Sequence, residues 1–128
     1  MNYRNLIYKG TSILKESFIK TAQIDAELLL TISLKKSREK ILLNLENKLS
    51  LEEIKKYLDL INRRKNNEPI SFIEGKRFFW KNEFIVNKNV LTPRYETEIL
   101  IEEVLRMHNT SNYINVLDII IRILVVCL

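Results

Sequence analysis

The sequence is poor in cysteine, histidine, glycine and proline. Its single cysteine, Cys127, excludes a disulfide within the chain, and its single histidine, His108, has no cysteine or histidine neighbour at the spacing of metal ligands. We therefore expect no metal site and a reducing, cytoplasmic location. Hydrophobic residues make up 46% of the chain and there are only two glycines, which favours a folded domain over a disordered segment.

Long hydrophobic runs are also scarce. The final stretch, IIIRILVVCL, is interrupted by Arg122 and is far shorter than the ~20 residues that a membrane-spanning helix needs. The first residues, MNYRNLIYKG, lack the apolar core of a signal peptide. We expect no contact with a membrane.

Positive charge is in modest excess, with a formal net charge of +5. Much of it lies in LKKSREK (residues 34–40) and INRRKNN (residues 61–67), which could contact phosphates or an acidic protein. Because no aromatic residues alternate with these charges, solvated helix ends are the favoured interpretation. We expect no direct contact with nucleic acid.

Residues 1–74 are predicted to form a helical bundle, because apolar residues recur there at helical spacing. Thr21, Ser37 and Ser50 each precede such a segment and are predicted to be N-caps. The segment EPISFIEG is predicted to add one more helical turn that ends at Gly75. The predicted apolar stripes are Leu6, Ile7, Ile13, Leu14 and Phe18; Ile24, Leu28, Leu29 and Ile32; and Leu51, Ile54, Leu58 and Ile61.

The pattern changes after Gly75. KRFFWKNEFIVNKNVL (residues 76–91) is rich in aromatic and β-branched residues and predicts a β-hairpin, with Phe79 and Trp80 in its core. YETEILIEEVLRMH (residues 95–108) predicts an amphipathic helix, and YINVLDIII (residues 113–121) predicts a buried strand. A helix followed by an apolar strand is how an α/β sheet begins.

Two features are candidates for chemistry. The helix predicted over residues 95–108 is preceded by Thr92, Pro93 and Arg94. The predicted apolar strand ends in Asp118, and such a strand end is a common entry to a cofactor site. The glycine-rich turn that normally follows such a strand is absent, since no glycine follows Gly75. Taken alone, VLDIII would be an ordinary buried strand.

Three stretches nevertheless resemble the glutamine methyltransferases that modify peptide chain release factors, the HemK/PrmC family. They are DAELLL (residues 25–30), RRKNNEPISFIEGKRFFWKNEFIVNKNVLTPRYETEILIEEVL (residues 63–105) and NVLDI (residues 115–119). The combination of EPISFIEG with TPRYETE is specific to this family. The family's glycine-rich loop and Asn-Pro-Pro-Tyr loop do not appear in the sequence.

The resemblance implies a mainly α chain with three parts: a helical substrate-recognition domain (1–74), a β-hairpin linker (75–91) and the truncated start of a Rossmann-like α/β methyltransferase domain (92–128). The family transfers a methyl group from S-adenosylmethionine to the glutamine amide of the Gly-Gly-Gln motif of release factors. The resemblance places Thr92, Pro93, Arg94 and Asp118 at the edge of the cofactor site and implies release factors as partners of a monomer. No catalytic residue is carried over, so we expect the truncated chain to be inactive and not to bind S-adenosylmethionine.

Several alternatives stay open. Thr92 could also be an N-cap, with Pro93 at the first helical position, which is compatible with a place beside the cofactor, whereas Arg94 could instead lie in solvent. Glu96 and Glu98 suit the positive end of the helix dipole as first-turn residues, and they could also orient Arg94. The helical part could also be a non-catalytic binding module that docks on release factors or on another protein.

Overall fold

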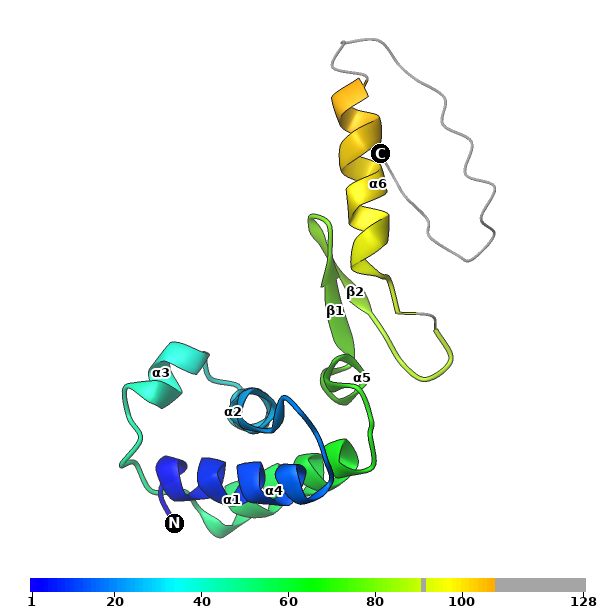
Figure 1. Cartoon of the computed structure of the whole chain (residues 1–128). Coiled ribbons are helices and arrows are strands. Elements are labelled where there is room, and N and C mark those ends of the chain that lie inside the picture. The colour runs from blue at the N-terminus through cyan, green and yellow to red at the C-terminus, as the bar shows by residue number, and fades with distance from the viewer. Residues whose placement is uncertain (91, 108–128) are drawn as a thin grey trace. The chain divides into compact units, whose positions relative to one another are not determined.

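The computed structural model describes residues 1–90 and 92–107, and the predicted strand at 113–121 lies outside them. The chain divides into two compact units, Met1–Glu74 and Gly75–Leu128. The described part is mainly helical, with one two-stranded antiparallel sheet, as predicted (Figure 1). The elements are α1 (Tyr3–Glu16), α2 (Ala22–Leu34), α3 (Arg38–Leu42), α4 (Leu51–Lys65), α5 (Ile70–Glu74), β1 (Lys76–Phe79), β2 (Asn82–Ile85) and α6 (Tyr95–Met107).

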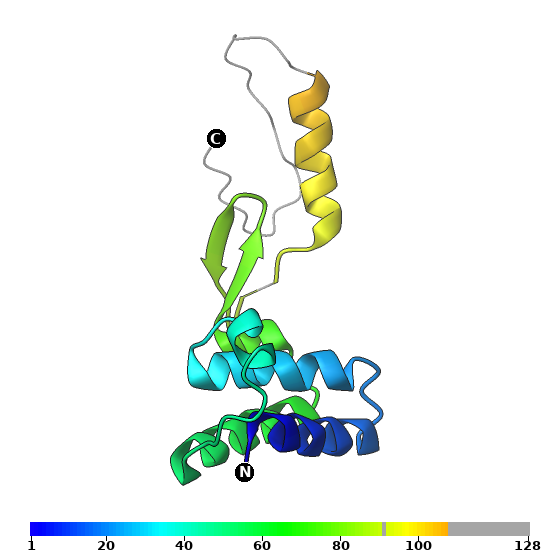
Figure 2. The same cartoon turned by 90° about the vertical axis from the view of Figure 1, so that its left-hand side faces the viewer.

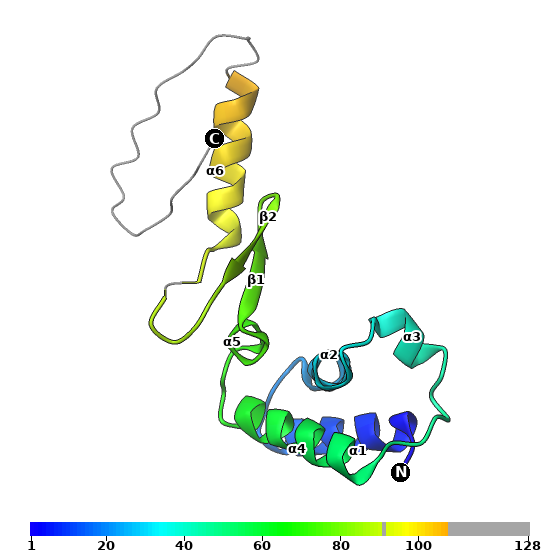
Figure 3. The ribbon, with the colours of Figure 1, turned by 180° about the vertical axis from the view of Figure 1, so that it is seen from behind.

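The first unit is a bundle in which α2 crosses over the pair formed by α1 and α4. Figure 1 shows α2 end-on while α1 and α4 are seen from the side, and Figure 3 shows the same arrangement from behind. In Figure 2, α3 lies next to α2, on the side that faces the viewer. The buried core contains Tyr3, Leu6, Leu14, Ile19, Ala22, Ala26, Leu29, Leu30, Ile41, Leu49, Tyr57, Ile61 and Ile73.

A glycine allows the close approach of α1 and α4. A Cβ atom on Gly10 would lie 2.9 Å from Tyr57 Cζ and 3.0 Å from Ile61 Cδ1, and it would overlap the Tyr57 hydroxyl. Tyr57 is fully buried, its hydroxyl donates to the Ala26 carbonyl at 3.3 Å, and burial raises the pKa of this phenol far above its usual value. One side chain of α4 therefore joins α1 and α2, and only glycine at position 10 leaves room for it.

The predicted helix starts are confirmed. The Ser50 hydroxyl accepts the Glu53 backbone N–H at 3.2 Å, and the Glu53 carboxylate accepts the Ser50 backbone N–H at 2.8 Å, which forms a capping box. The second of these bonds lowers the pKa of Glu53. Ser37 caps α3, whereas Thr21 holds the N-cap position of α2 without capping a backbone N–H, because its hydroxyl donates to Asp25 Oδ2 at 3.0 Å.

Three residues predicted to lie on apolar stripes are exposed instead. Phe18 is 94% exposed, because α1 ends at Glu16 and Phe18 follows the helix. Ile24 is 51% exposed, because the buried face of α2 passes through Ala22, Ala26 and Leu29. Leu51, the first residue of α4, is 86% exposed, and Tyr57 takes the core position on that helix.

The second unit begins with the hairpin. Gly75 has a φ of 80° and ends α5, as predicted, and the Val86 backbone N–H donates to its carbonyl at 3.0 Å. Phe79 faces Asn82 in the register, so the loop is Trp80-Lys81. Phe79 is buried and packs edge-on against Phe84 with 6.0 Å between ring centroids, which agrees with its predicted core position. The same prediction for Trp80 is wrong, because Trp80 lies in the loop, half-buried and with a φ of 53°.

Candidate functional site

The segment that leads into α6 carries the residues predicted to face a cofactor. The helix begins at Tyr95, and the Thr97 backbone N–H donates to the Arg94 carbonyl at 3.1 Å. Arg94 is therefore the residue that directly precedes the helix, with Thr92 and Pro93 before it. The alternative of Thr92 as N-cap and Pro93 at the first helical position is wrong, because the hydrogen bonds of the first turn start two residues later than the threonine and proline pattern suggested.

Arg94 is exposed, whereas Thr92 and Pro93 are half-buried. Among residues 1–90 and 92–107, no hydrogen bond or ion pair engages the Arg94 side chain. Its guanidinium is thus free, within this part of the chain, to meet an anionic group. Asp118, the fourth predicted site residue, lies outside the described residues.

Glu98 lies in the first turn of α6, as expected for an acidic residue at the positive end of the helix dipole, and it also makes a contact that was not expected. Its Oε1 accepts the backbone N–H of Trp80 at 3.0 Å, so the first turn of α6 is tied to the hairpin loop. The bond reaches across 18 residues of sequence, which is why the local pattern around Glu98 did not reveal it. It also holds the loop at the residue whose backbone has the unusual positive φ.

The helical unit contains a buried ion pair built from two of the stretches that resemble the methyltransferase family. Asp25 and Arg64 have side chains that are 8% and 19% exposed, and Arg64 Nε donates to Asp25 Oδ2 at 2.8 Å. Arg64 Nη1 also donates to the Glu68 carbonyl at 3.1 Å, and the Thr21 hydroxyl completes the contacts of Asp25. A charge buried to this degree must be paired, so these residues connect α2 to the end of α4.

A turn after α4 brings a second pair together. Asn67 has a φ of 63°, and the Glu68 backbone N–H donates back to the Arg63 carbonyl at 3.3 Å. Arg63 and Glu68 then form a two-pronged contact, with Nε to Oε2 at 2.8 Å and Nη2 to Oε1 at 2.5 Å. This contact lowers the pKa of Glu68 and raises that of Arg63.

Sequence reasoning treated Arg63 and Arg64 only as charges at a helix end, and it missed their partners. A signal was present, since Asp25 and Glu27 stand on either side of Ala26, at the start of an apolar run. Both carboxylates prove to be buried, and Glu27 accepts two hydrogen bonds from Arg38, from Nε at 3.0 Å and Nη2 at 2.5 Å. The ion pair between Glu27 and Arg38 holds α3 against α2.

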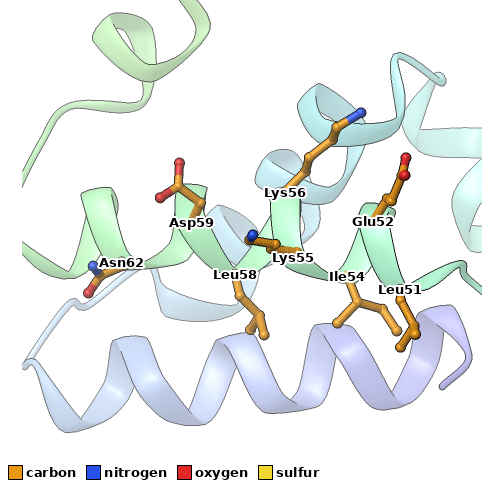
Figure 4. Close-up of a pocket in the computed structure, with 8 residues that line it drawn as sticks. All are labelled: Leu51, Glu52, Ile54, Lys55, Lys56, Leu58, Asp59 and Asn62. Atoms are coloured by element: carbon orange, nitrogen blue, oxygen red, sulfur yellow. The ribbon is translucent and has the colours of Figure 1, made fainter.

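A shallow surface hollow of about 750 Å³ lies along α4. Figure 4 shows Leu51, Ile54 and Leu58 pointing toward α1 at its apolar side. The charged and polar residues that line the rest of it are Glu52, Lys55, Lys56, Asp59 and Asn62. Its two carboxylates and two lysines balance in charge, and none of these side chains is fully buried.

Neither a metal site nor a membrane helix is found in the described residues. No group of three or more histidine, cysteine, aspartate or glutamate residues there is arranged to hold a metal ion. Nor does any described helix combine the length and the apolar character required to cross a bilayer.

Comparison with known proteins supplies the family. Residues 5–75 match the model of the PrmC N-terminal domain. The chain belongs to this family. The ion pairs Asp25–Arg64 and Arg63–Glu68 lie within the matched residues, so they are part of the PrmC N-terminal domain of this chain.

Relatives with curated names extend the match beyond the PrmC N-terminal domain. The chain is 42% identical to the release factor glutamine methyltransferase of Clostridium botulinum over 119 residues, which are 93% of this chain and 42% of that protein. It is 38% identical to that of Clostridium acetobutylicum, with the same coverage, and 40% identical to that of Caulobacter vibrioides over 82% of this chain and 36% of the relative. These matches confirm the resemblance seen in the motifs, and the chain spans about two fifths of the length of these relatives.

Proposed function

We propose that this chain is the N-terminal part of a release factor glutamine methyltransferase, and that its helical unit recognises the release factor. The observation that carries the proposal is the match of residues 5–75 to the PrmC N-terminal domain, together with relatives named release factor glutamine methyltransferase. The reaction is methyl transfer from S-adenosylmethionine to the side-chain amide nitrogen of the glutamine in Gly-Gly-Gln. The protein acts in the cytoplasm, as a monomer.

The charges of the helical unit support a binding role over a catalytic one. Its two buried carboxylates, Asp25 and Glu27, are each satisfied by an arginine, Arg64 and Arg38. A general acid or base needs a group that can exchange a proton with a substrate, and these carboxylates are held inside ion pairs. The surface offers instead a hollow along α4, with Leu51, Ile54 and Leu58 on its apolar side and charged residues around the rest, an arrangement suited to docking.

Cofactor binding is assigned to the segment before α6. We propose that Thr92, Pro93 and Arg94 border the methionine end of S-adenosylmethionine in the whole enzyme, with Asp118 on the same cofactor. The exposed Arg94 guanidinium, which has no partner within residues 1–90 and 92–107, suits the cofactor's carboxylate. One arginine at the rim of a site does not replace a glycine-rich turn that lets backbone approach the ligand. The 128 residues by themselves are therefore proposed not to bind the cofactor measurably or to transfer a methyl group.

Two measurements on the purified chain test this proposal. Isothermal titration calorimetry with a release factor is expected to show binding, and a filter assay with methyl-labelled S-adenosylmethionine is expected to show no transfer to Gly-Gly-Gln. The intact Clostridium botulinum relative is the positive control for transfer. Methyl transfer by the 128-residue chain would refute the proposal that these residues do not catalyse the reaction by themselves. Absence of release-factor binding would refute recognition of the release factor by the helical unit.

A second function is favoured by one observation, the self-contained core of the unit Met1–Glu74. Such a unit could serve as a binding module that docks on a release factor without modifying it, or on another protein. Co-expression with the intact relative distinguishes the first case, because a pure docking module would lower the methylation of the release factor by competing for it. A module with another partner would leave that methylation unchanged.

A further inference from the structure

The loop between α1 and α2 places a phenylalanine where the backbone favours glycine. Phe18 has a φ of 59°, in the left-handed region, directly after the last turn of α1. Its N–H donates to the Lys15 carbonyl at 2.9 Å, and the Ile19 N–H donates to the Leu14 carbonyl at 3.2 Å. This pair of bonds is the Schellman motif, whose left-handed position is usually glycine, because any Cβ atom is crowded there.

The phenyl ring of Phe18 gains no stabilising burial within the described residues that would offset this backbone strain. Phe18 is 94% exposed, the largest value among the exposed large apolar residues of the described chain. The apolar contact that normally accompanies the motif is made by its neighbours Leu14 and Ile19, which are both buried in the core. Single apolar residues on a surface are common, but Phe18 combines full exposure with a backbone conformation that a bulky residue rarely adopts.

The other left-handed residues of the helical unit provide a contrast. Asn67 tolerates this conformation because its short polar side chain can hydrogen-bond locally, and Lys35 is a polar residue in solvent at the end of α2. Phe18 alone in this unit combines the strained backbone with an aromatic ring in water. Residues in such conformations cluster at binding sites, where the cost in stability is retained for a contact with another molecule.

We propose that Phe18 is the apolar anchor through which the helical unit holds its protein partner, the release factor. This inference rests on the proposed function for the identity of the partner. The segment from Lys15 to Lys20 also indicates the partner's chemistry, because it carries two exposed lysines and one carboxylate, Glu16. Neither lysine forms an ion pair within the described part of the chain. The partner surface is therefore an apolar pocket bordered by carboxylates.

The test uses the 128-residue chain and replaces Phe18 by glycine. F18G is expected to raise the folded-to-unfolded equilibrium constant about fivefold in urea titrations, because the left-handed backbone is no longer strained. The same variant is expected to weaken binding of a release factor about tenfold or more in calorimetry, because an anchor residue is removed. A variant that folds better and binds worse separates recognition from loss of structure.

Two variants serve as matched controls. K35G relieves the other strained helix end and is expected to stabilise the chain without changing release-factor affinity. L43A removes an apolar side chain that is 83% exposed on an ordinary right-handed backbone, and it should also leave affinity unchanged.

Each result decides the proposal. Weaker binding by F18G alone supports the anchor. If the wild-type chain binds and F18G binds equally well, the anchor is wrong while release-factor recognition stands. If the wild-type chain does not bind the release factor, the proposed function and this inference both fail. If F18G abolishes self-association in sedimentation velocity and leaves release-factor binding intact, the ring contacts a second copy of the chain, which also overturns the proposal.

Discussion

Replacing Gly10 by alanine tests the packing that holds the helical unit together. In an exposed helix the change would stabilise the fold by roughly 0.5–1 kcal/mol, because alanine restricts the unfolded chain and favours helix. Here the new methyl group would lie within 3.0 Å of both the Tyr57 ring and Ile61, so side chains in a closed core must move.

The magnitude follows from the contacts that would be disturbed. Overpacking a core by one methyl group costs about 1–3 kcal/mol. Displacing the Tyr57 hydroxyl from the Ala26 carbonyl would cost about 1 kcal/mol more. After subtraction of the gain in helix propensity, G10A is expected to lower the free energy of unfolding by about 1–3 kcal/mol. For a unit of this size that corresponds to a fall in Tm of roughly 5–20 °C.

A double-mutant cycle with Y57F isolates the cause. The single change Y57F is expected to cost about 1 kcal/mol, because it removes one buried hydrogen bond. In the double variant the shortest contact of the new methyl group no longer exists, so the combined loss should be smaller than the sum of the single losses by about 1 kcal/mol. Urea unfolding followed by circular dichroism at 222 nm measures all four proteins.

The control is K9A, one residue earlier on the exposed side of α1, which should change stability by less than about 0.5 kcal/mol. If G10A stabilises the chain, or if its effect adds independently to that of Y57F, then α1 and α4 do not approach as closely as the structure shows. The reasoning from the missing Cβ atom would then be refuted.

Three further outcomes are expected from the same unfolding measurements. D25N should lower the free energy of unfolding by about 2–4 kcal/mol, because it leaves the Arg64 guanidinium without its buried counter-charge. T11V should raise the free energy of unfolding by about 1 kcal/mol, because the buried Thr11 hydroxyl has no hydrogen-bond partner within residues 1–90 and 92–107. Acid should weaken the fold through Glu53, whose pKa is held below the usual 4.5, so its contribution is complete above pH 4.5 and is lost as pH falls through the lowered value.

Each of these has a control. E46Q breaks an ion pair whose side chains are 64% and 71% exposed, and a loss as large as that of D25N would contradict the importance of burial. T31V removes a hydroxyl that donates to the Leu28 carbonyl at 2.6 Å, so stabilisation by this variant would undermine the explanation for T11V. E53Q keeps an acceptor at the cap but cannot titrate in this range, and an acid-induced loss of stability as steep as that of the wild-type chain would exclude Glu53 as a contributor.

The sequence predicted most elements correctly where the deciding interactions are local. Ser50 and Glu53 are three residues apart and form the capping box that starts α4, and Gly75 ends α5 with the positive φ that only glycine adopts without strain. The hairpin and α6 were predicted correctly from the types and spacing of their side chains. At the candidate site, the sequence correctly placed Thr92, Pro93 and Arg94 before a helix that begins at Tyr95, and only the alternative with Thr92 as N-cap put the helix start two residues too early.

Family membership, too, was readable in the sequence, because motifs such as EPISFIEG preserve residue types in a fixed order. What those residues do was not readable. Arg64 meets Asp25 across 39 residues, and Glu98 meets Trp80 across 18, so neither contact leaves a mark at helical or strand spacing.

Tertiary structure alone decided which apolar residues enter the core. Phe18 and Tyr57 are both aromatic residues at helical spacing from apolar neighbours, yet one is 94% exposed and the other is fully buried. The difference arises because Gly10 opens a space on α1 into which the Tyr57 ring fits, whereas the turn after Glu16 directs Phe18 away from every described neighbour. Periodicity specifies which residues could face a core, and the close packing of three helices selects among them.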